Sequence, residues 1–265
     1  MPDTPLGRFC WYELMTTDPG AARAFYSAVT GWTAKESDVG DMPYTEWQVG
    51  GASVGGLMEL PEEARAAGAP PNWMAYVSTP DTEATLARVE ELGGSAMWGP
   101  TDIPGVGRVA WFTDPWGAAL ALHEPAPGDS YVPVDPGTPG AFSWHELATD
   151  DWREARTFYH ELLGWGDAGE HDMGPEMGIY YMFSDEGAST PEESVGGIFN
   201  RPDQMPVNAW TVYVRVEDIT KALDTVSSGG GSVASGPMEV PGGDTVAVCV
   251  DPQGAVFALH QGMGG

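Results

Sequence analysis

The stretch GRFCWYELMTTDPGAARAFYSAVTGW, residues 7–32, recurs as GAFSWHELATDDWREARTFYHELLGW, residues 140–165. Thirteen of the 26 positions are identical at a constant offset of 133. A second pair of blocks, residues 73–123 and 210–260, matches at 22 of 51 positions at an offset of 137. Self-similarity on this scale indicates a tandem repeat. The change of offset predicts an insertion-tolerant loop, and the polar, turn-rich residues 184–194 are the natural place for it.

A proline-rich segment separates the two copies. Residues 125–139 hold five prolines in 15 residues, a composition typical of a stiff, extended linker. We therefore place domain 1 at residues 1–125, the linker at 126–139 and domain 2 at 140–265.

The local signals follow one order in both copies. A short strand over residues 11–15 or 144–148 leads to a helix that Asp18 or Asp151 caps and that Gly31 or Gly164 ends. Short strands follow, and the pattern then restarts with a strand over residues 73–78 and a helix over 81–92. Each domain is thus predicted to be two β-α-β-β-β modules. The expected fold class is α+β, with curved mixed sheets, helices outside and a concave face inside.

Charge and composition limit the classes of partner. The chain has 265 residues, 11 Lys+Arg against 39 Asp+Glu and a formal net charge of −28. This field repels nucleic acids and anionic membranes, so we expect neither as a partner. No apolar run approaches the length of a membrane span, and the first residues lack the pattern of a signal peptide. Two cysteines form no disulfide framework, which favours a reducing cytoplasm. The acidity has two interpretations, salt adaptation or plain acidity.

The quoted motifs resemble a known superfamily. The run WxEL-x-T-x-D…ARxFY…GW, the helix ending in a double glycine and the closing DPxGAxxAL strand are similar to the vicinal oxygen chelate superfamily. That superfamily includes glyoxalase I, bleomycin-resistance proteins and extradiol dioxygenases, and the resemblance covers nearly all of both copies. It implies tandem domains, each with two β-α-β-β-β modules around a cavity, but it implies no particular activity.

The resemblance also implies where a metal would be bound. In metal-dependent members the ligands come from the first and last strands of each module. Carried over position by position, those ligand positions hold residues that are not usual ligands of divalent metals. They are Trp11, Gly56, Met74 and Ala121 in domain 1, and Trp144, Gly197, Thr211 and Ala258 in domain 2. We therefore expect no metal cofactor at the family position, and a divalent metal only as the less favoured alternative.

Polar side chains stand two positions further along the same strands, and thus on the same face. They are Glu13, Tyr76 and His123 in domain 1, and Glu146, Tyr213 and His260 in domain 2. Three interpretations remain open: a hydrogen-bonded structural cluster, a polar anchor for a ligand, or a displaced metal or acid–base site. A displaced metal site would use Glu13 and His123, or Glu146 and His260. With Trp11 and Trp144, these residues are the candidate ligand-binding set.

The remaining motifs are weaker. His145, His160 and His171 are interpreted as surface histidines. The sequence shows no Ser-His-Asp spacing, phosphate-binding loop or CxxC pair.

Two hypotheses for function follow. The first is a metal-independent protein, a monomer or homodimer, that binds a flat or apolar small molecule in aromatic cavities and sequesters or processes it. The alternative is a glyoxalase-like enzyme of lyase, isomerase or dioxygenase type, with a displaced Glu/His metal site or metal-free acid–base chemistry. A scaffold without ligand is third.

Overall fold

The computed structural model describes residues 4–39, 42–126, 134–175, 177–185, 187 and 190–263. Residues 127–133 of the predicted linker, and residues 186, 188 and 189 of the predicted insertion loop, lie outside that range. Within it, no helix is both long and apolar enough to cross a membrane.

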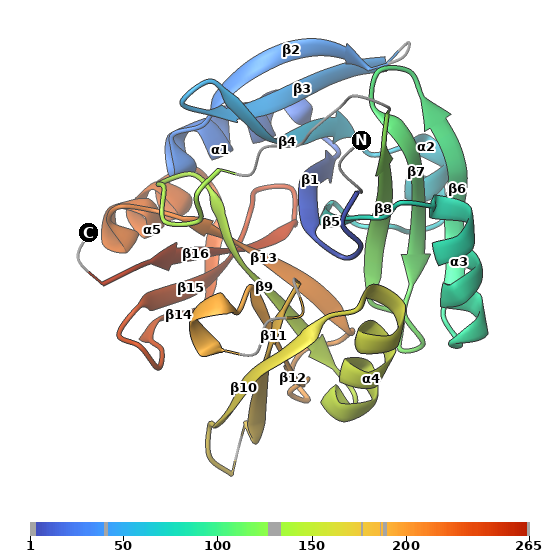
Figure 1. Cartoon of the computed structure of the whole chain (residues 1–265). Helices are drawn as coiled ribbons and strands as arrows, with labels where there is room; N and C mark the ends of the chain where they lie inside the picture. The colour runs from blue at the N-terminus through green and yellow to red at the C-terminus, as the bar shows by residue number, and fades with distance from the viewer. Residues whose placement is uncertain are drawn as a thin grey trace. The chain divides into compact units, whose positions relative to one another are not determined.

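The elements follow the predicted module order (Figure 1). The first copy contains β1 (Phe9–Thr16), α1 (Pro19–Thr30), β2 (Thr33–Val39), β3 (Met42–Val49), β4 (Ala52–Glu59), α2 (Glu62–Ala66), β5 (Asn72–Ser78), α3 (Thr82–Glu91), β6 (Ser95–Ile103), β7 (Gly107–Thr113) and β8 (Ala119–Pro125). The second contains β9 (Phe142–Thr149), α4 (Trp152–Leu163), β10 (Gly166–Asp172), β11 (Ile179–Ser184), a 3-10 turn (Pro191–Glu193), β12 (Gly196–Asn200), β13 (Ala209–Arg215), α5 (Ile219–Ser228), β14 (Ser232–Glu239), β15 (Thr245–Val250) and β16 (Val256–Gln261).

The predicted helix ends are confirmed. The Asp18 carboxylate accepts a hydrogen bond from the backbone N–H of Ala21, the third residue of α1, and Asp151 accepts from those of Arg153 and Glu154 in α4. Gly31 and Gly164 follow the two helices with φ of 76° and 73°, the left-handed region that favours glycine. Identical local chemistry therefore builds the same helix in both copies.

The strands form two eight-stranded mixed sheets, which confirms the α+β fold class. Their orders are β2-β3-β4-β1-β5-β8-β7-β6 and β10-β11-β12-β9-β13-β16-β15-β14. In every module the first strand pairs in parallel with the last, as in β1 with β4 and β5 with β8. The remaining neighbours within a module are antiparallel.

Compact packing divides the chain differently from the repeat. Unit 1 takes its residues from Met1–Cys10, Ala75–Tyr131 and His145–Trp210, and unit 2 from Trp11–Met74, Val132–Trp144 and Thr211–Gly265. Each unit thus contains the second module of one copy and the first module of the other. Within unit 1, α3 packs on α4; within unit 2, α1 packs on α5.

The same buried set of hydrogen bonds, in which a tyrosine hydroxyl links an aspartate to a tryptophan, appears in both units. This tyrosine–aspartate tie explains two of the repeated motifs. In unit 1 the Tyr159 hydroxyl donates to Asp114 at 3.0 Å and accepts from Trp210 Nε1 at 3.0 Å. In unit 2, Tyr26 donates to Asp251 at 3.1 Å and accepts from Trp73 Nε1 at 2.9 Å. The tyrosines are those of the FY pairs and the aspartates those of the DPxG turns, so each tie joins the two copies. Because each polar group is bonded, its burial is compatible with stability.

Candidate functional site

An aromatic row crosses four strands of unit 1. Tyr76 on β5 and Trp111 on β7 both lie opposite Ala121 on β8, and Trp98 on β6 lies opposite Trp111. Residues directly opposite each other share one face of a sheet. The Trp98 and Trp111 ring centroids are 4.9 Å apart, and Trp111 Nε1 donates to the Tyr76 hydroxyl at 3.3 Å. Trp98 is 40% exposed, a large value for this side chain.

The second copy has no such row. Its corresponding positions, in the same register, are Tyr213, Ala258, Val248 and Ser235. Tyr213 and Ala258 are preserved, but an aliphatic side chain and a small polar one replace the two tryptophans. The apolar, π-rich surface is therefore a feature of the first copy alone.

The predicted glutamates are each held by a tyrosine. Tyr180 on β11 donates to Glu146 on β9 at 3.0 Å. Tyr44 on β3 likewise hydrogen-bonds Glu13 on β1. Burial and the Glu13 charge raise the pKa of Tyr44 well above its ordinary value, so this hydroxyl keeps its proton.

Two glycines make room for these pairs. Gly56 lies opposite Glu13, and Gly197 lies opposite Glu146. A Cβ at either glycine would overlap the tyrosine that crosses it. The positions that the resemblance gives to metal ligands on β4 and β12 are thus glycines, and tyrosine rings fill the space beside them.

The two predicted tryptophans, Trp11 and Trp144, lie on the same strands as these glutamates. Trp11 Nε1 donates to the Tyr44 hydroxyl at 2.9 Å, so Trp11, Tyr44 and Glu13 form one hydrogen-bonded series in unit 2. Trp144 on β9 is partly buried.

The predicted histidines lie in different surroundings in the two copies. In unit 1, His123 Nδ1 is 3.8 Å from Cys10 Sγ, and its Nε2 is 3.0 Å from the Val106 carbonyl oxygen. In unit 2, His260 Nδ1 is 2.9 Å from Ser143 Oγ, and its Nε2 is 2.7 Å from an Asp244 carboxylate oxygen.

The strand register corrects the expected alignment of these residues. Tyr76 is level with Ala121, whereas His123 is level with Ser78. Tyr213 is likewise level with Ala258, and His260 with Arg215. Tyrosine and histidine are therefore one row apart rather than in the same row, because the parallel pairing of β5 with β8 and of β13 with β16 is shifted by two residues from the alignment assumed.

His145 is also not a surface residue, contrary to the prediction. It is 6% exposed, stacks on Phe9 with ring centroids 3.6 Å apart, and lies with Nδ1 2.7 Å from the Val195 carbonyl oxygen. Alternation placed it on the face opposite Trp144, and that face is packed rather than solvated. His160 and His171 are exposed, as predicted.

The sequence analysis did not assign three features to a site. Two are Trp98 and Trp111 of the aromatic row, which the abundance of tryptophan on the strands could have indicated. The approach of Ser143, His260 and Asp244 had no sequence signal, because three separate segments supply them.

The donor set does not fit a divalent metal. Among the described residues, no group of three or more His, Cys, Asp or Glu side chains is placed to hold an ion. The four residues expected at a displaced metal site already have other partners. Glu13 and Glu146 accept hydrogen bonds from tyrosines, and both ring nitrogens of His123 and His260 have partners. Tight sites usually require three or four such donors.

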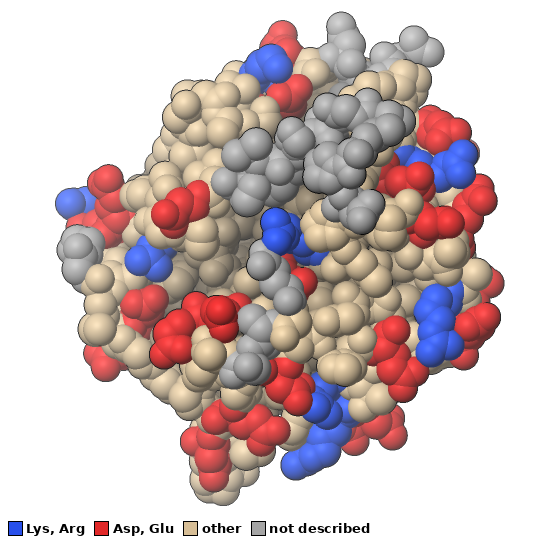
Figure 2. All heavy atoms as spheres, in the orientation of Figure 1, with Lys and Arg blue, Asp and Glu red and all other residues tan. Residues whose placement is uncertain are grey.

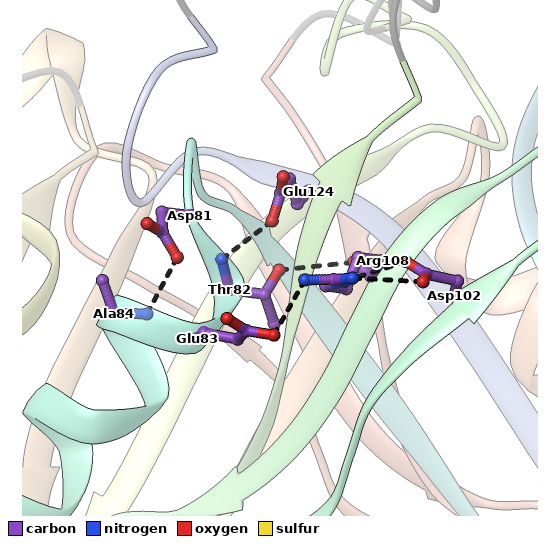
Figure 3. A network of polar contacts seen from close by, with 7 residues as sticks. All are labelled: Asp81, Thr82, Glu83, Ala84, Asp102, Arg108 and Glu124. Carbon is purple, nitrogen blue, oxygen red and sulfur yellow. Dashed lines mark hydrogen bonds and ion pairs between the residues drawn. The ribbon is translucent and has the colours of Figure 1, made fainter.

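A polar groove of about 420 Å³ lies over the β6–β7 hairpin and the end of β8, lined by residues including Asp102, Arg108 and Glu124. Figure 3 shows the polar network of its lining: Arg108 binds both Asp102 oxygens and Glu83, and Glu124 accepts from the backbone N–H of Thr82 at the start of α3. On β8, Glu124 alternates with His123, so the groove lies on the opposite sheet face from the aromatic row. Arg108 is thus paired with Asp102 and Glu83, and Glu124 has a backbone partner.

The visible surface is strongly acidic. Figure 2 shows carboxylate side chains spread over that face, with the few Lys and Arg groups bordering them. Several basic groups of the described residues are in exposed ion pairs, such as Arg23 with Glu36 at 3.2 Å. Exposed pairs of this kind contribute little to stability.

Four β-α-β-β-β modules in two mixed sheets define the vicinal-oxygen-chelate class of protein. The chain belongs to the glyoxalase/bleomycin resistance protein/dioxygenase superfamily, whose family model matches residues 8–122 and 141–259.

Named relatives match over nearly the whole chain. A Mycobacterium tuberculosis protein named "Putative glyoxylase CFP32" is 31% identical over 251 residues, which are 94% of this chain and 92% of the relative. The anthracycline biosynthesis protein DnrV of Streptomyces peucetius is 32% identical over 264 residues, 96% of this chain and 92% of the relative. The Mn(II)-bound glyoxalase of Novosphingobium aromaticivorans superposes with a TM-score of 0.64 at 18% identity, over 97% of this chain and 83% of that chain. That last likeness is one of fold.

Proposed function

We propose that this protein binds a planar aromatic small molecule on the row formed by Tyr76, Trp111 and Trp98, without a metal. The observation that carries the proposal is that Tyr76 and Trp111 flank Ala121 on neighbouring strands. Where metal-dependent relatives would place a carboxylate, this chain has a methyl group between two aromatic side chains. A flat ligand would stack on the indole rings, which offer large area at low conformational cost.

The polar end of the row would orient such a ligand. The Tyr76 hydroxyl accepts from Trp111 Nε1 at 3.3 Å, so the row ends in a fixed polar group beside its aromatic face. One aromatic face beside one hydroxyl is the usual composition of a small-molecule site.

The relatives support the choice of ligand class. Two proteins that match over almost the full chain are named for anthracycline biosynthesis, one from Streptomyces sp. strain C5 and one from Streptomyces peucetius. Anthracyclines are flat, aromatic and oxygenated, which is the chemistry that the row suits. The buried free thiols Cys10 and Cys249 suit a reducing compartment, so we propose that binding takes place in the cytoplasm.

The test is a calorimetric titration of the whole chain with an anthracycline, in buffer that contains a chelator. We expect saturable binding that the chelator does not alter. Trp98→Ala and Trp111→Leu should each raise the dissociation constant roughly tenfold, because a lost stacking contact is worth about 1.4 kcal/mol.

Matched controls come from the second copy. Ser235→Ala and Val248→Ala change the corresponding positions and should leave the affinity unaltered, while far-UV circular dichroism verifies the fold of every variant. Affinity that is unchanged in both tryptophan variants, or that appears only with added metal, would reject the proposal.

A further inference from the structure

Three side chains from separate segments of unit 2 form a continuous polar series. Ser143 on β9 lies with Oγ 2.9 Å from His260 Nδ1 on β16, and His260 Nε2 lies 2.7 Å from Asp244 Oδ2, just before β15. Ser143 Oγ is also 3.4 Å from the Tyr213 carbonyl oxygen, a longer contact. A hydroxyl, an imidazole and a carboxylate in this order constitute the arrangement that activates a serine.

The carboxylate determines which ring nitrogen of His260 carries the proton. Two groups meet His260 Nε2: the Asp244 carboxylate at 2.7 Å, which only accepts, and Arg215 Nη1 at 3.2 Å, which only donates. The shorter, charge-assisted contact with Asp244 favours a proton on Nε2. Nδ1 then presents its lone pair to the Ser143 hydroxyl and is placed to take its proton. Burial lowers the pKa of His260 and outweighs the opposing effect of the Asp244 hydrogen bond, so the ring is neutral near neutral pH.

Asp244 is itself fixed from two sides. Its other oxygen accepts from the backbone N–H of Met263 at 2.8 Å, and Arg215 lies 3.7 Å from Oδ2. The side chain of His260 is 12% exposed and that of Asp244 33% exposed, and Ser143 is only partly buried. The series is therefore held in place yet accessible to a small reactant.

The first copy provides an internal comparison. Its corresponding positions are Cys10, His123 and Gly107. A backbone carbonyl bonds His123 Nε2 there, and a Cβ at Gly107 would overlap the Glu124 backbone. Burial raises the pKa of the Cys10 thiol, which keeps it protonated. Only the second copy thus has the acid and an accessible hydroxyl.

We propose that Ser143 is a catalytic nucleophile for acyl transfer from small esters, with His260 as general base and Asp244 as a positioning residue. The Ser143 oxygen bonds to the ester carbonyl carbon while His260 Nδ1 takes the hydroxyl proton. The bond to the leaving alcohol then breaks, and that alcohol leaves with the proton. Water, deprotonated by His260, hydrolyses the acyl-serine and returns the serine hydroxyl. The net reaction is ester plus water to carboxylic acid plus alcohol. The inference does not rest on the aromatic row, since no residue of that row takes part.

The experiment uses the whole chain, a fluorophosphonate probe and p-nitrophenyl acetate. We expect the probe to label one serine per chain, identified as Ser143 by peptide mass spectrometry, and p-nitrophenol to be released catalytically. Ser143→Ala should abolish labelling and reduce the hydrolysis rate at least about a hundredfold. Cys10→Ala, the matched variant in the first copy, should change neither result.

The role of Asp244 is tested by a measurement that distinguishes positioning of His260 from a purely structural effect. Asp244→Asn should lower kcat at least about tenfold with KM unchanged, and Asp244→Glu should restore part of kcat. Absence of labelling in the folded wild-type chain would overturn the proposal. So would labelling or hydrolysis that persists in Ser143→Ala.

Discussion

The buried imidazole of His145 makes a sharp pH-dependent stability prediction. The ring is 6% exposed and stacks on Phe9 at an interplanar angle of 4°. Its Nδ1–H donates to the Val195 carbonyl oxygen at 2.7 Å. Burial lowers the pKa of His145 from 6.5 to about 4, because the charged ring would lose its hydration.

The sign and size of the effect follow from linkage. As pH falls, the unfolded chain binds a proton at His145 near pH 6.5, whereas the folded chain does not until about pH 4. The contribution of His145 to stability is therefore fully present above pH 6.5 and lost progressively down to about pH 4. Between about pH 7.5 and pH 5, it amounts to a loss of about 2 kcal/mol of unfolding free energy.

His145→Phe is the informative change. Phenylalanine preserves the stack on Phe9, and the Val195 carbonyl still accepts the backbone N–H of residue 145 at 3.1 Å. At pH 7.5 we expect the variant to be about 1 kcal/mol less stable, from the lost side-chain hydrogen bond. At pH 5 the order should reverse, because only the wild type has lost stability through this site.

Urea unfolding of both proteins at the two pH values measures the difference directly. The other acidic groups titrate equally in both, so they cancel in the comparison. Equal losses of stability in wild type and variant would refute the reasoning, as would an imidazole NMR titration that places the pKa of His145 near 6.5.

Two further predictions concern packing and charge. Gly197→Ala should lower the unfolding free energy by about 2 kcal/mol or more, because the new Cβ overlaps Tyr180 and breaks its bond to Glu146. Gly20→Ala, in α1 with nothing nearer than 3.4 Å, is the control and should be neutral or slightly stabilising in the same urea assay. If the net charge of −28 reflects salt adaptation, the melting temperature should rise steadily as KCl is increased toward molar concentration, through screening of like charges. A flat response in differential scanning fluorimetry would favour plain acidity.

Unequal chemistry in the two copies is the main functional result. Both retain the tyrosine–aspartate ties and the glutamate–tyrosine pairs that build the fold. Only the first has the tryptophan row, and only the second has the serine–histidine–aspartate series. A duplicated scaffold can change one copy without losing stability, because the ties depend on neither set.

The candidate site was predictable in part. Glu13, Glu146, His123 and His260 were found by strand alternation, and each does make polar contacts. Their partners were not predictable, since Tyr44 and Tyr180 reach them across neighbouring strands. Nor was the shifted level of Tyr76, because alternation gives the face of a strand but not its register with the next strand.

What the sequence determined by itself is the chain's local order. The offset repeat, the aspartate caps, the glycine stops and the DPxG turns fix four β-α-β-β-β modules, because capping and turn chemistry act over a few residues. Tertiary structure alone decided which side chains meet. The compact units join modules from different copies, and Ser143 reaches His260 and Asp244 across more than a hundred residues of chain. The physical reason is that parallel pairing and packing are long-range contacts, and their register is set by the cooperative burial of whole strands rather than by any one segment.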